Sequence, residues 1–283
     1  MKICVASGKG GTGKTTVAVN LATAIDEEVV LLDCDVEEPN ANLFLKGDFV
    51  DREISYVKVP KVDESLCDGC RKCTEICEFK AIIVIEKVPM LFYDLCHSCG
   101  ACYHICPQKA ISEVDRRIGE INHYKKRNVH LYEGRLDIGV AMAPPIIKGL
   151  KKHIEDDKIC ILDAPPGTSC PTIETLKDGD VAILVTEPTP FGLNDLILAI
   201  EVTKQLNIPF GVVINRSDMG DDRVHNYLKQ ENIPILMEIK HDIEIARLYS
   251  KGKVIVEELP EYKDMFLELK DKALALSKKR TVA

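Results

Sequence analysis

A glycine-rich run near the start of the chain has the residue types and spacing of a phosphate-binding loop. Residues 8–15 read G-x-x-x-x-G-K-T and directly follow the apolar residues 3–6. Glycines let successive backbone N–H groups turn toward a phosphate, and a helix beginning at Lys14 would point its positive end at the same anion. In such loops the lysine neutralises the β- and γ-phosphate oxygens, and the next hydroxyl binds Mg²⁺. The motif predicts a nucleoside triphosphate site, with Lys14 on the phosphates and Thr15 on the metal.

The same loop fits a second motif. Gly8, Gly10 and Gly13 satisfy G-x-G-x-x-G, the fingerprint of dinucleotide-binding folds. That fingerprint does not need Lys-Thr at its end, whereas a triphosphate site does, so the triphosphate interpretation is preferred. The loop residues expected to contact nucleotide are Gly8, Lys9, Gly10, Gly11, Thr12, Gly13, Lys14, Thr15 and Thr16.

Acidic residues follow two short apolar runs. Residues 29–32 are followed by Asp33 and Asp35, and residues 159–162 are followed by Asp163. Four successive apolar residues are typical of a strand buried in a parallel sheet, and such sheets bind ligands at the carboxyl ends of their strands. Asp163 therefore has the form of a Walker B residue that holds a Mg²⁺ water. A strand-end carboxylate can instead cap a loop, and for Asp33 both interpretations stay open.

Eight of the twelve cysteines form two runs of identical spacing. The first run is Cys67, Cys70, Cys73 and Cys77, and the second is Cys96, Cys99, Cys102 and Cys106. Each reads C-x-x-C-x-x-C-x-x-x-C, the spacing of two-cluster bacterial ferredoxins, in which the fourth cysteine of a run ligates the other cluster. The expected ligands are Cys67, Cys70, Cys73 and Cys106 for one [4Fe–4S] cluster, and Cys96, Cys99, Cys102 and Cys77 for the other. Structural zinc is the alternative, but zinc sites usually separate two ligand pairs by about 12 or more residues and need only four ligands.

The other four cysteines lack this pattern. Cys4, Cys34 and Cys160 lie in apolar or strand-end runs and are expected to be small buried hydrophobic residues. Cys170 follows Asp163 by seven residues. We expect Cys170 to pack or to act in a switch rather than to ligate a cluster.

Composition limits the classes of function. A chain of 283 residues suffices for one large α/β domain or for two domains, and a formal net charge of −8 argues against a nucleic-acid-binding surface as the main role. No apolar run reaches the roughly 18 residues of a membrane span, and no cleavable signal precedes the first strand and loop. We expect a cytoplasmic protein without nucleic-acid or membrane partners, whose cysteines are not disulfide-bonded. The basic tail of Lys278, Lys279 and Arg280 is expected to be a solvated helix end.

Apolar spacing predicts the main elements. Strands are expected at residues 3–6, 29–32, 138–142, 159–162, 181–186, 210–214 and 235–238, and helices at residues 14–25, 146–154, 193–206 and 262–279. The pattern of residues 48–61 is irregular and β-like, and residues 121–136 read as a hairpin.

With its additional lysine, Lys9, the loop resembles the deviant Walker A box of the MinD/Mrp/ParA and nitrogenase iron-protein group of ATPases. In that group the early lysine reaches the partner's phosphates in a nucleotide-sandwiched dimer, which implies a homodimer here; a solvated loop lysine is the alternative. The resemblance makes residues 33–40 the switch I region. Asp35 would then polarise the attacking water or hold a Mg²⁺ water, with Asp33 in support.

The resemblance extends to two later segments. Residues 164–168 resemble the switch II segment of the Mrp branch, in which the N–H of Gly167 would sense the γ-phosphate. Asn215 and Arg216 resemble the pair that reads adenine, with a plain strand-end turn as the alternative. The implied catalytic residues are Lys9, Lys14, Asp35 and Asp163, and the implied Mg²⁺ ligands are Thr15, Asp35 and Asp163.

Together with the cysteine runs, the resemblance implies an α/β fold: a doubly wound, mostly parallel P-loop NTPase sheet with an inserted ferredoxin-like α+β module. The expected domains are residues 1–59 and 113–283 for the ATPase and residues 60–112 for the insert. The implied cofactors are ATP, Mg²⁺ and two [4Fe–4S] clusters.

The implied function is a Mg-ATP-binding, slowly hydrolysing iron–sulfur ATPase. We expect nucleotide state to be coupled, through switch I, to electron transfer from the two clusters to a redox partner. Electron transfer is preferred to cluster delivery because clusters with a full set of ligands are expected to remain bound. The alternative is an iron–sulfur cluster assembly or carrier ATPase with an acceptor partner, although the C-terminal C-x-x-C of Mrp-type carriers is missing. A spatial regulator of the MinD kind is a third hypothesis, but no membrane-targeting amphipathic tail is evident.

Overall fold

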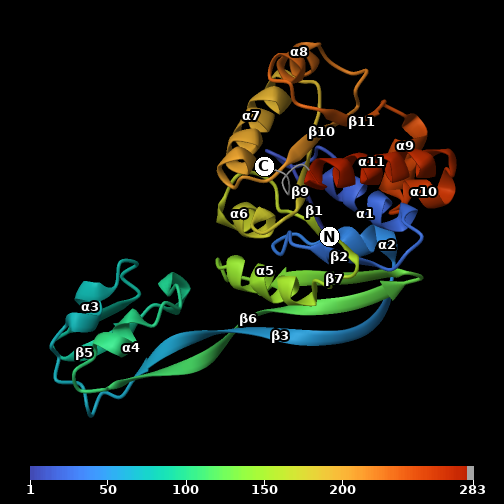
Figure 1. Ribbon diagram of the computed structural model, residues 1–283. Helices are drawn as coiled ribbons and strands as arrows, with labels where there is room; N and C mark the ends of the chain where they lie inside the picture. Colours follow the sequence, from blue (N-terminus) through green and yellow to red (C-terminus); the bar gives the residue numbers. More distant parts are fainter. Residues whose placement is uncertain (279–283) are drawn as a thin grey trace.

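A nine-stranded sheet forms the centre of the structure, a computed structural model that describes residues 1–278. The strand order is β11-β10-β9-β1-β8-β2-β7-β6-β3 (Figure 1). The strands are β1 (Lys2–Ala6), β2 (Val29–Asp33), β3 (Asp48–Val62), β6 (Ile111–Lys126), β7 (Val129–Leu136), β8 (Ile159–Asp163), β9 (Val181–Thr186), β10 (Phe210–Asn215) and β11 (Ile235–Ile239). Neighbours from β11 to β7 pair in parallel, whereas β6 and β3 extend the edge in antiparallel pairs. The predicted α/β fold with a mostly parallel sheet is confirmed.

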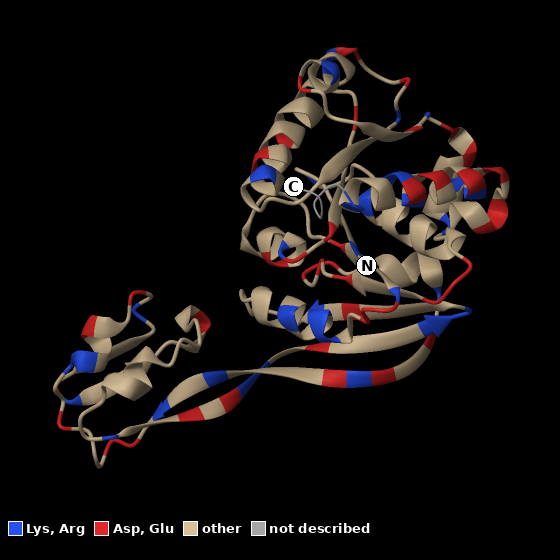
Figure 2. Ribbon diagram, viewed as in Figure 1, with Lys and Arg blue, Asp and Glu red and all other residues tan. Residues whose placement is uncertain are grey.

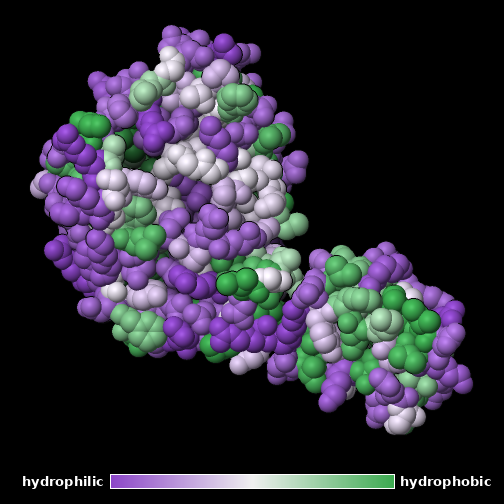
Figure 3. Space-filling view, turned by 180° about the vertical axis from the view of Figure 1, so that it is seen from behind, coloured by the Kyte–Doolittle hydropathy of each residue, from purple (hydrophilic) through white to green (hydrophobic). Residues whose placement is uncertain are grey.

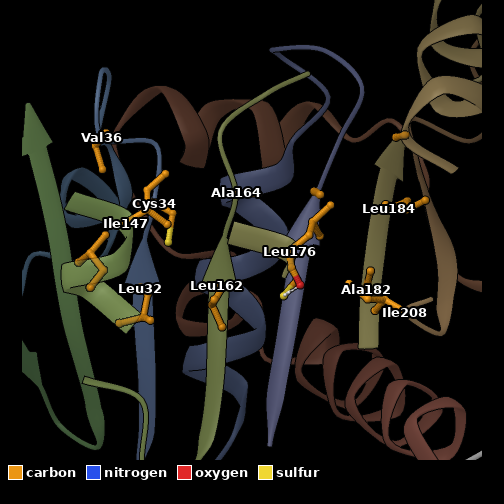
Figure 4. Close-up of a cluster of buried hydrophobic side chains, with 14 of the residues drawn as sticks. Leu32, Cys34, Val36, Ile147, Leu162, Ala164, Leu176, Ala182, Leu184 and Ile208 are labelled. Carbon is orange, nitrogen blue, oxygen red and sulfur yellow. Dashed lines mark hydrogen bonds between the residues drawn. The ribbon is translucent and has the colours of Figure 1, made fainter. Parts of the chain in front are cut away.

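Helices cover both faces of this sheet, because its central strands are apolar on both sides. The helices are α1 (Lys14–Ala24), α2 (Ala41–Leu45), α5 (Pro144–Leu150), α6 (Cys170–Leu176), α7 (Pro190–Gln205), α8 (Arg223–Gln230), α9 (Ile243–Ser250), α10 (Ile255–Glu258) and α11 (Glu261–Lys278), with a 3-10 turn η2 (Lys151–His153) after α5. One core cluster lies under α1 and α11, and the other lies under α5 to α8. In the second cluster, Leu32, Leu162 and Ala182 come from three strands of the sheet (Figure 4).

Strands β3 and β6 leave the main sheet as a two-stranded ribbon and carry a small arm, residues 63–110, at their far end (Figure 1). The arm contains α3 (Lys72–Ile76), β4 (Ile82–Ile85), β5 (Val88–Leu91), a 3-10 turn η1 (Tyr93–Leu95) and α4 (Ala101–Ile105), and β4 pairs with β5 in a separate sheet. Opposite charges alternate along the ribbon (Figure 2), as in the pair between Lys58 and Asp115, 2.9 Å apart. Such exposed pairs add little free energy each, so the 14 paired positions of the ribbon depend mainly on the backbone ladder.

Several expected elements differ from the structure. Residues 138–142 form no strand: Gly139 has φ +84°, which turns the chain away from the sheet, and Ile138 is fully exposed. The expected helix at residues 146–154 is shorter, because α5 ends at Leu150 and gives way to η2. The hairpin at residues 121–136 is confirmed, although its first strand begins ten residues earlier, at Ile111.

The remaining expectations concern the chain's end and its surroundings. The C-terminal helix is confirmed up to Lys278, whereas Lys279 and Arg280 lie outside the described residues. Within residues 1–278, no helix is long and apolar enough to cross a membrane. The division into residues 1–59, 60–112 and 113–283 stays a prediction.

Candidate functional site

The glycine-rich loop joins β1 to α1 and comes very close to two other segments. Gly13 caps the start of α1 with φ +94°, and a Cβ at this position would lie 2.5 Å from the side-chain nitrogen of Asn215. A Cβ at Gly8 would lie 2.0 Å from the carbonyl oxygen of Asp195 in α7. Both positions therefore require glycine, one for its backbone conformation and both for space.

Lys14 lies at the centre of the site, among carboxylates. Its Nζ is 3.5 Å from Asp163 Oδ1 and 4.0 Å from Asp35 Oδ2, and its side chain is only 8% exposed. Burial lowers the pKa of Lys14, but the charges of Asp163, Asp35 and Asp33 outweigh burial, and the net shift is upward. The amine therefore stays charged, as phosphate binding requires.

Asp33 and Asp163 are paired in register on neighbouring strands, so their buried carboxylates lie side by side. Burial and the nearby charge of Asp163 raise the pKa of Asp33 to about 8, and burial also raises the pKa of Asp163. Burial raises the pKa of Asp35 to about 6, against the opposing effect of Lys14. Three carboxylates therefore face one lysine, and the excess negative charge favours a cation.

Asp33 also organises the loop that follows β2. Its Oδ2 accepts the backbone N–H groups of Asn40 and Ala41, each at 2.9 Å, and its Oδ1 accepts the N–H of Asp35 at 3.2 Å. These contacts agree with the interpretation of Asp33 as a residue that caps a loop.

Two buried oxygens at the site have no hydrogen-bond partner in the described residues: Asp163 Oδ2 and Thr12 Oγ1. Buried polar groups are normally paired, so each is an available donor or acceptor for a ligand. Carboxylate and hydroxyl oxygens are the ligands that Mg²⁺ prefers, directly or through water. The residues present fit Mg²⁺ bound with a nucleotide, and the assignment of Thr15, Asp35 and Asp163 to it stays a prediction.

The residues taken from the switch II and adenine motifs make contacts within the chain. The N–H of Gly167 donates to the carbonyl of Ser7 at 3.0 Å, so it would have to leave Ser7 to reach a phosphate. The Asn215 amide donates to the carbonyl of Thr12 at 2.9 Å, and Arg216 pairs with Glu187 at 2.7 Å. Sequence reasoning missed this support of the loop by Asn215, because the two segments are 203 residues apart.

Lys9 is half-buried, and no ion pair of its side chain is found within residues 1–278. Its backbone carbonyl accepts the hydroxyl of Ser7 at 2.7 Å. This leaves the charged amine available to an external phosphate, and its role across a dimer stays a prediction.

The eight cysteines of the two runs line two cavities in the arm. The first cavity is lined by Cys67, Cys70, Cys73 and Cys106, and the second is lined by Cys77, Cys96, Cys99 and Cys102. Each cavity thus contains three cysteines of one run and the fourth of the other. The grouping is the one expected from two-cluster ferredoxins.

Partial burial raises the pKa of three of these thiols: Cys73, Cys96 and Cys102, the last to about 11. Within residues 1–278, no group of three or more His, Cys, Asp or Glu is arranged to hold a single metal ion. A cubane presents four irons and takes one cysteine on each, so its ligands need not converge on one point. The donor set fits such a cluster, and the ligand assignments stay predictions.

The other cysteines divide into two kinds. Cys4, Cys34 and Cys160 are fully buried, as expected. Cys170 is exposed at the start of α6, so the packing interpretation of this residue is wrong, because no neighbouring side chains enclose it. A role for Cys170 beside switch II stays a prediction.

A doubly wound, mostly parallel sheet with a P-loop directly after its first strand is the architecture of the P-loop nucleoside triphosphatases. The family model for the CobQ/CobB/MinD/ParA nucleotide binding domain matches residues 3–255, and the chain belongs to this family. Family membership, the fold and the site together make the protein an ATP-binding P-loop ATPase.

Individual relatives extend over most of the chain. The uncharacterised protein MJ0578 of Methanocaldococcus jannaschii is 33% identical over 288 residues, which cover 96% of each chain. An iron-sulfur cluster carrier protein of Pyrococcus horikoshii is 25% identical and covers 96% of this chain and 84% of that one. The septum site-determining protein MinD of P. horikoshii, solved with Mg-ADP, superposes with a TM-score of 0.59 at 23% identity, covering 96% of this chain and 94% of that one, which supports the fold alone.

Proposed function

We propose that this ATPase acts in iron–sulfur cluster assembly or delivery, with its arm binding two [4Fe–4S] clusters. The observation that carries the proposal is the pair of arm cavities, each lined by four cysteines. The relative named as a cluster carrier in P. horikoshii supports delivery over the electron-transfer role expected first. Because the sequence has no C-x-x-C beyond the second run, the arm cysteines would have to hold the transferred cluster.

In this proposal, the ATPase site supplies the energy for a change of shape. Lys14 binds the β- and γ-phosphates, while Thr15, Asp35 and Asp163 hold Mg²⁺ and its waters. Asp35 is placed to orient the attacking water, since it is the least buried of the three carboxylates. Asn215 supports the loop through its hydrogen bond to the Thr12 carbonyl, and Asn215 and Arg216 would contact the adenine.

Iron analysis and cluster transfer test the proposal together. After anaerobic purification, the protein should contain about eight iron and eight sulfide per chain, as two cubanes require. The loaded protein should then activate apo-aconitase, faster with Mg·ATP than with Mg·ADP. Stoichiometric zinc in place of iron would refute the cluster assignment. Full iron content without transfer to the acceptor would refute delivery.

Electron transfer is the second candidate, and a specific feature favours it. Four cysteines per cavity leave no open coordination position, which suits a resident cluster rather than a transferred one. If this role is the correct one, iron stays bound in the transfer assay while a reduced partner protein is formed in the presence of Mg·ATP.

We also infer a homodimer that closes on nucleotide, with Lys9 reaching the partner's phosphates. Its support is the unpaired amine of Lys9 at the loop. Sedimentation with Mg·ATP should show a dimer for the wild type and a monomer for Lys9→Ala, with Lys152→Ala as an exposed control. A dimer in the Lys9→Ala variant would remove Lys9 from the interface.

A further inference from the structure

A third cavity lies where the arm meets the ATPase core, and it differs from the two cysteine cavities in having walls from both. This narrow junction cavity is lined by Tyr93, Asp94 and Cys96 of the arm, by Val140, Ala141 and Met142 of the core, and by Val57, Val59, Arg116 and Ile118 of the ribbon. Residues 138–142, which had been expected to form a strand, thus lie in a loop, residues 137–143, that contacts the arm.

The contact involves the second cysteine cavity and not the first. Cys96 lines the second cavity and the junction cavity, and both Cys96 and Val140 pack against the core cluster under α5 to α8. Every residue lining the first cavity lies between Val62 and Ile111, within the arm and the tip of the ribbon. The two cavities are therefore unequal in their relation to the ATPase.

The arm side of the junction is held to the ribbon by one arginine. Arg116 donates to Asp94 at 2.5 Å, and its guanidinium lies 5.8 Å from the centre of the Tyr93 ring. Asp94 is largely exposed, so this ion pair orients the arm against the ribbon but adds little to the free energy of folding. A shift of the 137–143 loop would thus act on Tyr93 and Cys96, which line the junction cavity together with it.

The core side of the junction connects to switch I. The N–H of Leu136 donates to the carbonyl of Val36 at 2.8 Å, and Val36 directly follows Asp35. Val36 packs so closely on Gly134 that a Cβ there would lie 2.7 Å from Val36 Cγ1. A displacement of Val36 therefore moves the end of β7, because packed contacts of this kind transmit strain.

The first residue of the loop is fixed to the ribbon as well. Arg117 makes a bidentate ion pair with Asp137, at 2.9 and 3.1 Å, and the Asp137 N–H donates to the carbonyl of Ile118 at 2.9 Å. Beyond this anchor, residues 138–142 lack ladder hydrogen bonds, so they are free to follow a movement of the end of β7.

We propose that Val140 and Met142 are positioning residues through which nucleotide state acts on the second cysteine cavity and leaves the first unaffected. The inference rests on the proposed function, because it concerns clusters held in the arm. The route runs from Asp35 and Val36 across a hydrogen bond to β7, and then through the loop to Cys96. A route along the ribbon alone would reach both cavities alike.

Because the chain contains no tryptophan, single tryptophans can report on each cavity separately. Tyr93→Trp places the reporter in the junction, and Leu66→Trp places it beside Cys67, at a side chain that is 53% exposed. Fluorescence of the full-length protein should differ between Mg·ADP and a non-hydrolysable Mg·ATP analogue for Tyr93→Trp, with no difference for Leu66→Trp. Equal responses from both reporters, or none from either, would overturn the proposed route.

A second substitution tests the positioning residues themselves. In the Tyr93→Trp background, Val140→Ser should remove most of the nucleotide-dependent change, whereas Val140→Ile should keep it, with ATPase activity retained in both. An unchanged response in Val140→Ser would exclude this residue from the route. Failure of the proposed function is seen separately, as a lack of stoichiometric iron, because the fluorescence comparison needs no iron.

Discussion

At the scale of single residues, Lys14 has the most contacts with opposite charge in the nucleotide site. It is 8% exposed and faces Asp163 and Asp35 before any phosphate arrives. On nucleotide binding, these carboxylates would exchange the lysine for Mg²⁺. The two carboxylates therefore keep Lys14 charged and oriented before the nucleotide binds, and they would release it to the phosphates afterwards.

Replacing this lysine should weaken nucleotide binding while leaving the arm intact. A charge-assisted hydrogen bond contributes about 1.5–3 kcal/mol, so Lys14→Ala should weaken ATP binding by roughly 10- to 150-fold. Isothermal calorimetry measures the affinity, and Lys152→Ala is the exposed control. Iron content should equal that of the wild type. ATP turnover at the wild-type rate in Lys14→Ala would contradict the site.

The raised pKa of Asp35 predicts a pH dependence in the nucleotide-free, Mg²⁺-free protein. Its folded-state value of about 6 exceeds the value near 3.8 in the unfolded chain, so the folded state binds a proton more readily between these two pH values. The stabilising contribution of the protonated carboxyl is therefore present at low pH and is lost as the pH rises from about 4 to about 6. Relative to wild type, Asp35→Asn should gain roughly 2 kcal/mol of stability over this range.

Thermal melts of both proteins at several pH values measure this difference. Mg²⁺ with nucleotide should reduce it, because a bound cation lowers the pKa of Asp35. A constant difference in melting temperature across pH 4–7 would show that Asp35 titrates normally.

At the scale of elements, the arm brings its two cysteine runs together by crossing them. The short helices α3 and α4 each carry the third cysteine of a run, and Cys77 and Cys106 end them. A helix of five residues makes fewer than two turns. The fourth cysteine, at the far end of the helix, is therefore separated from the loop that holds the first two cysteines of its run. The cavity linings then group Cys77 with the second run and Cys106 with the first.

Paired substitutions test this crossing. Cys77 and Cys99 line the same cavity. The double variant Cys77→Ser, Cys99→Ser should therefore lose about half of the iron, the same loss that we expect for each single variant. Cys77→Ser with Cys70→Ser affects both cavities and should lose nearly all of it. Iron analysis with electron paramagnetic resonance distinguishes the cases. The opposite pattern would mean that each run encloses its own cluster.

At the scale of the whole molecule, the ribbon carries the arm at its far end (Figure 1). The exposed apolar side chains of the arm gather on its surface (Figure 3), where Leu66, Phe79 and Leu95 are about half exposed. Exposed apolar patches of this kind mark interaction sites on soluble proteins. A partner that meets the arm need not touch the ATPase.

The arm should therefore be replaceable by a turn. Val62 and Ile111 are paired across the ribbon, so an Asn-Gly turn in place of residues 63–110 would close it as a hairpin. The shortened protein should keep ATP affinity and contain no iron, as measured by calorimetry and metal analysis. Lost nucleotide affinity would show that the arm supports the ATPase fold, against the expected domain division.

Local spacing in the sequence determined the features that depend on neighbouring residues. The P-loop, the buried central strands and the cysteine runs are all recognisable within short windows, because backbone conformation and ligand spacing are set locally. The ribbon was less visible, since residues 48–56 of β3 are exposed or only half-buried and show no regular apolar alternation.

Only the tertiary structure decided how distant segments meet. It placed Asn215 under the P-loop, left Cys170 exposed, and turned residues 138–142 out of the sheet toward the arm. Each of these depends on pairs of residues far apart in the chain, whose contacts are selected by the packing of the whole sheet. No local pattern contains that information, because the same residues would pack differently against other neighbours.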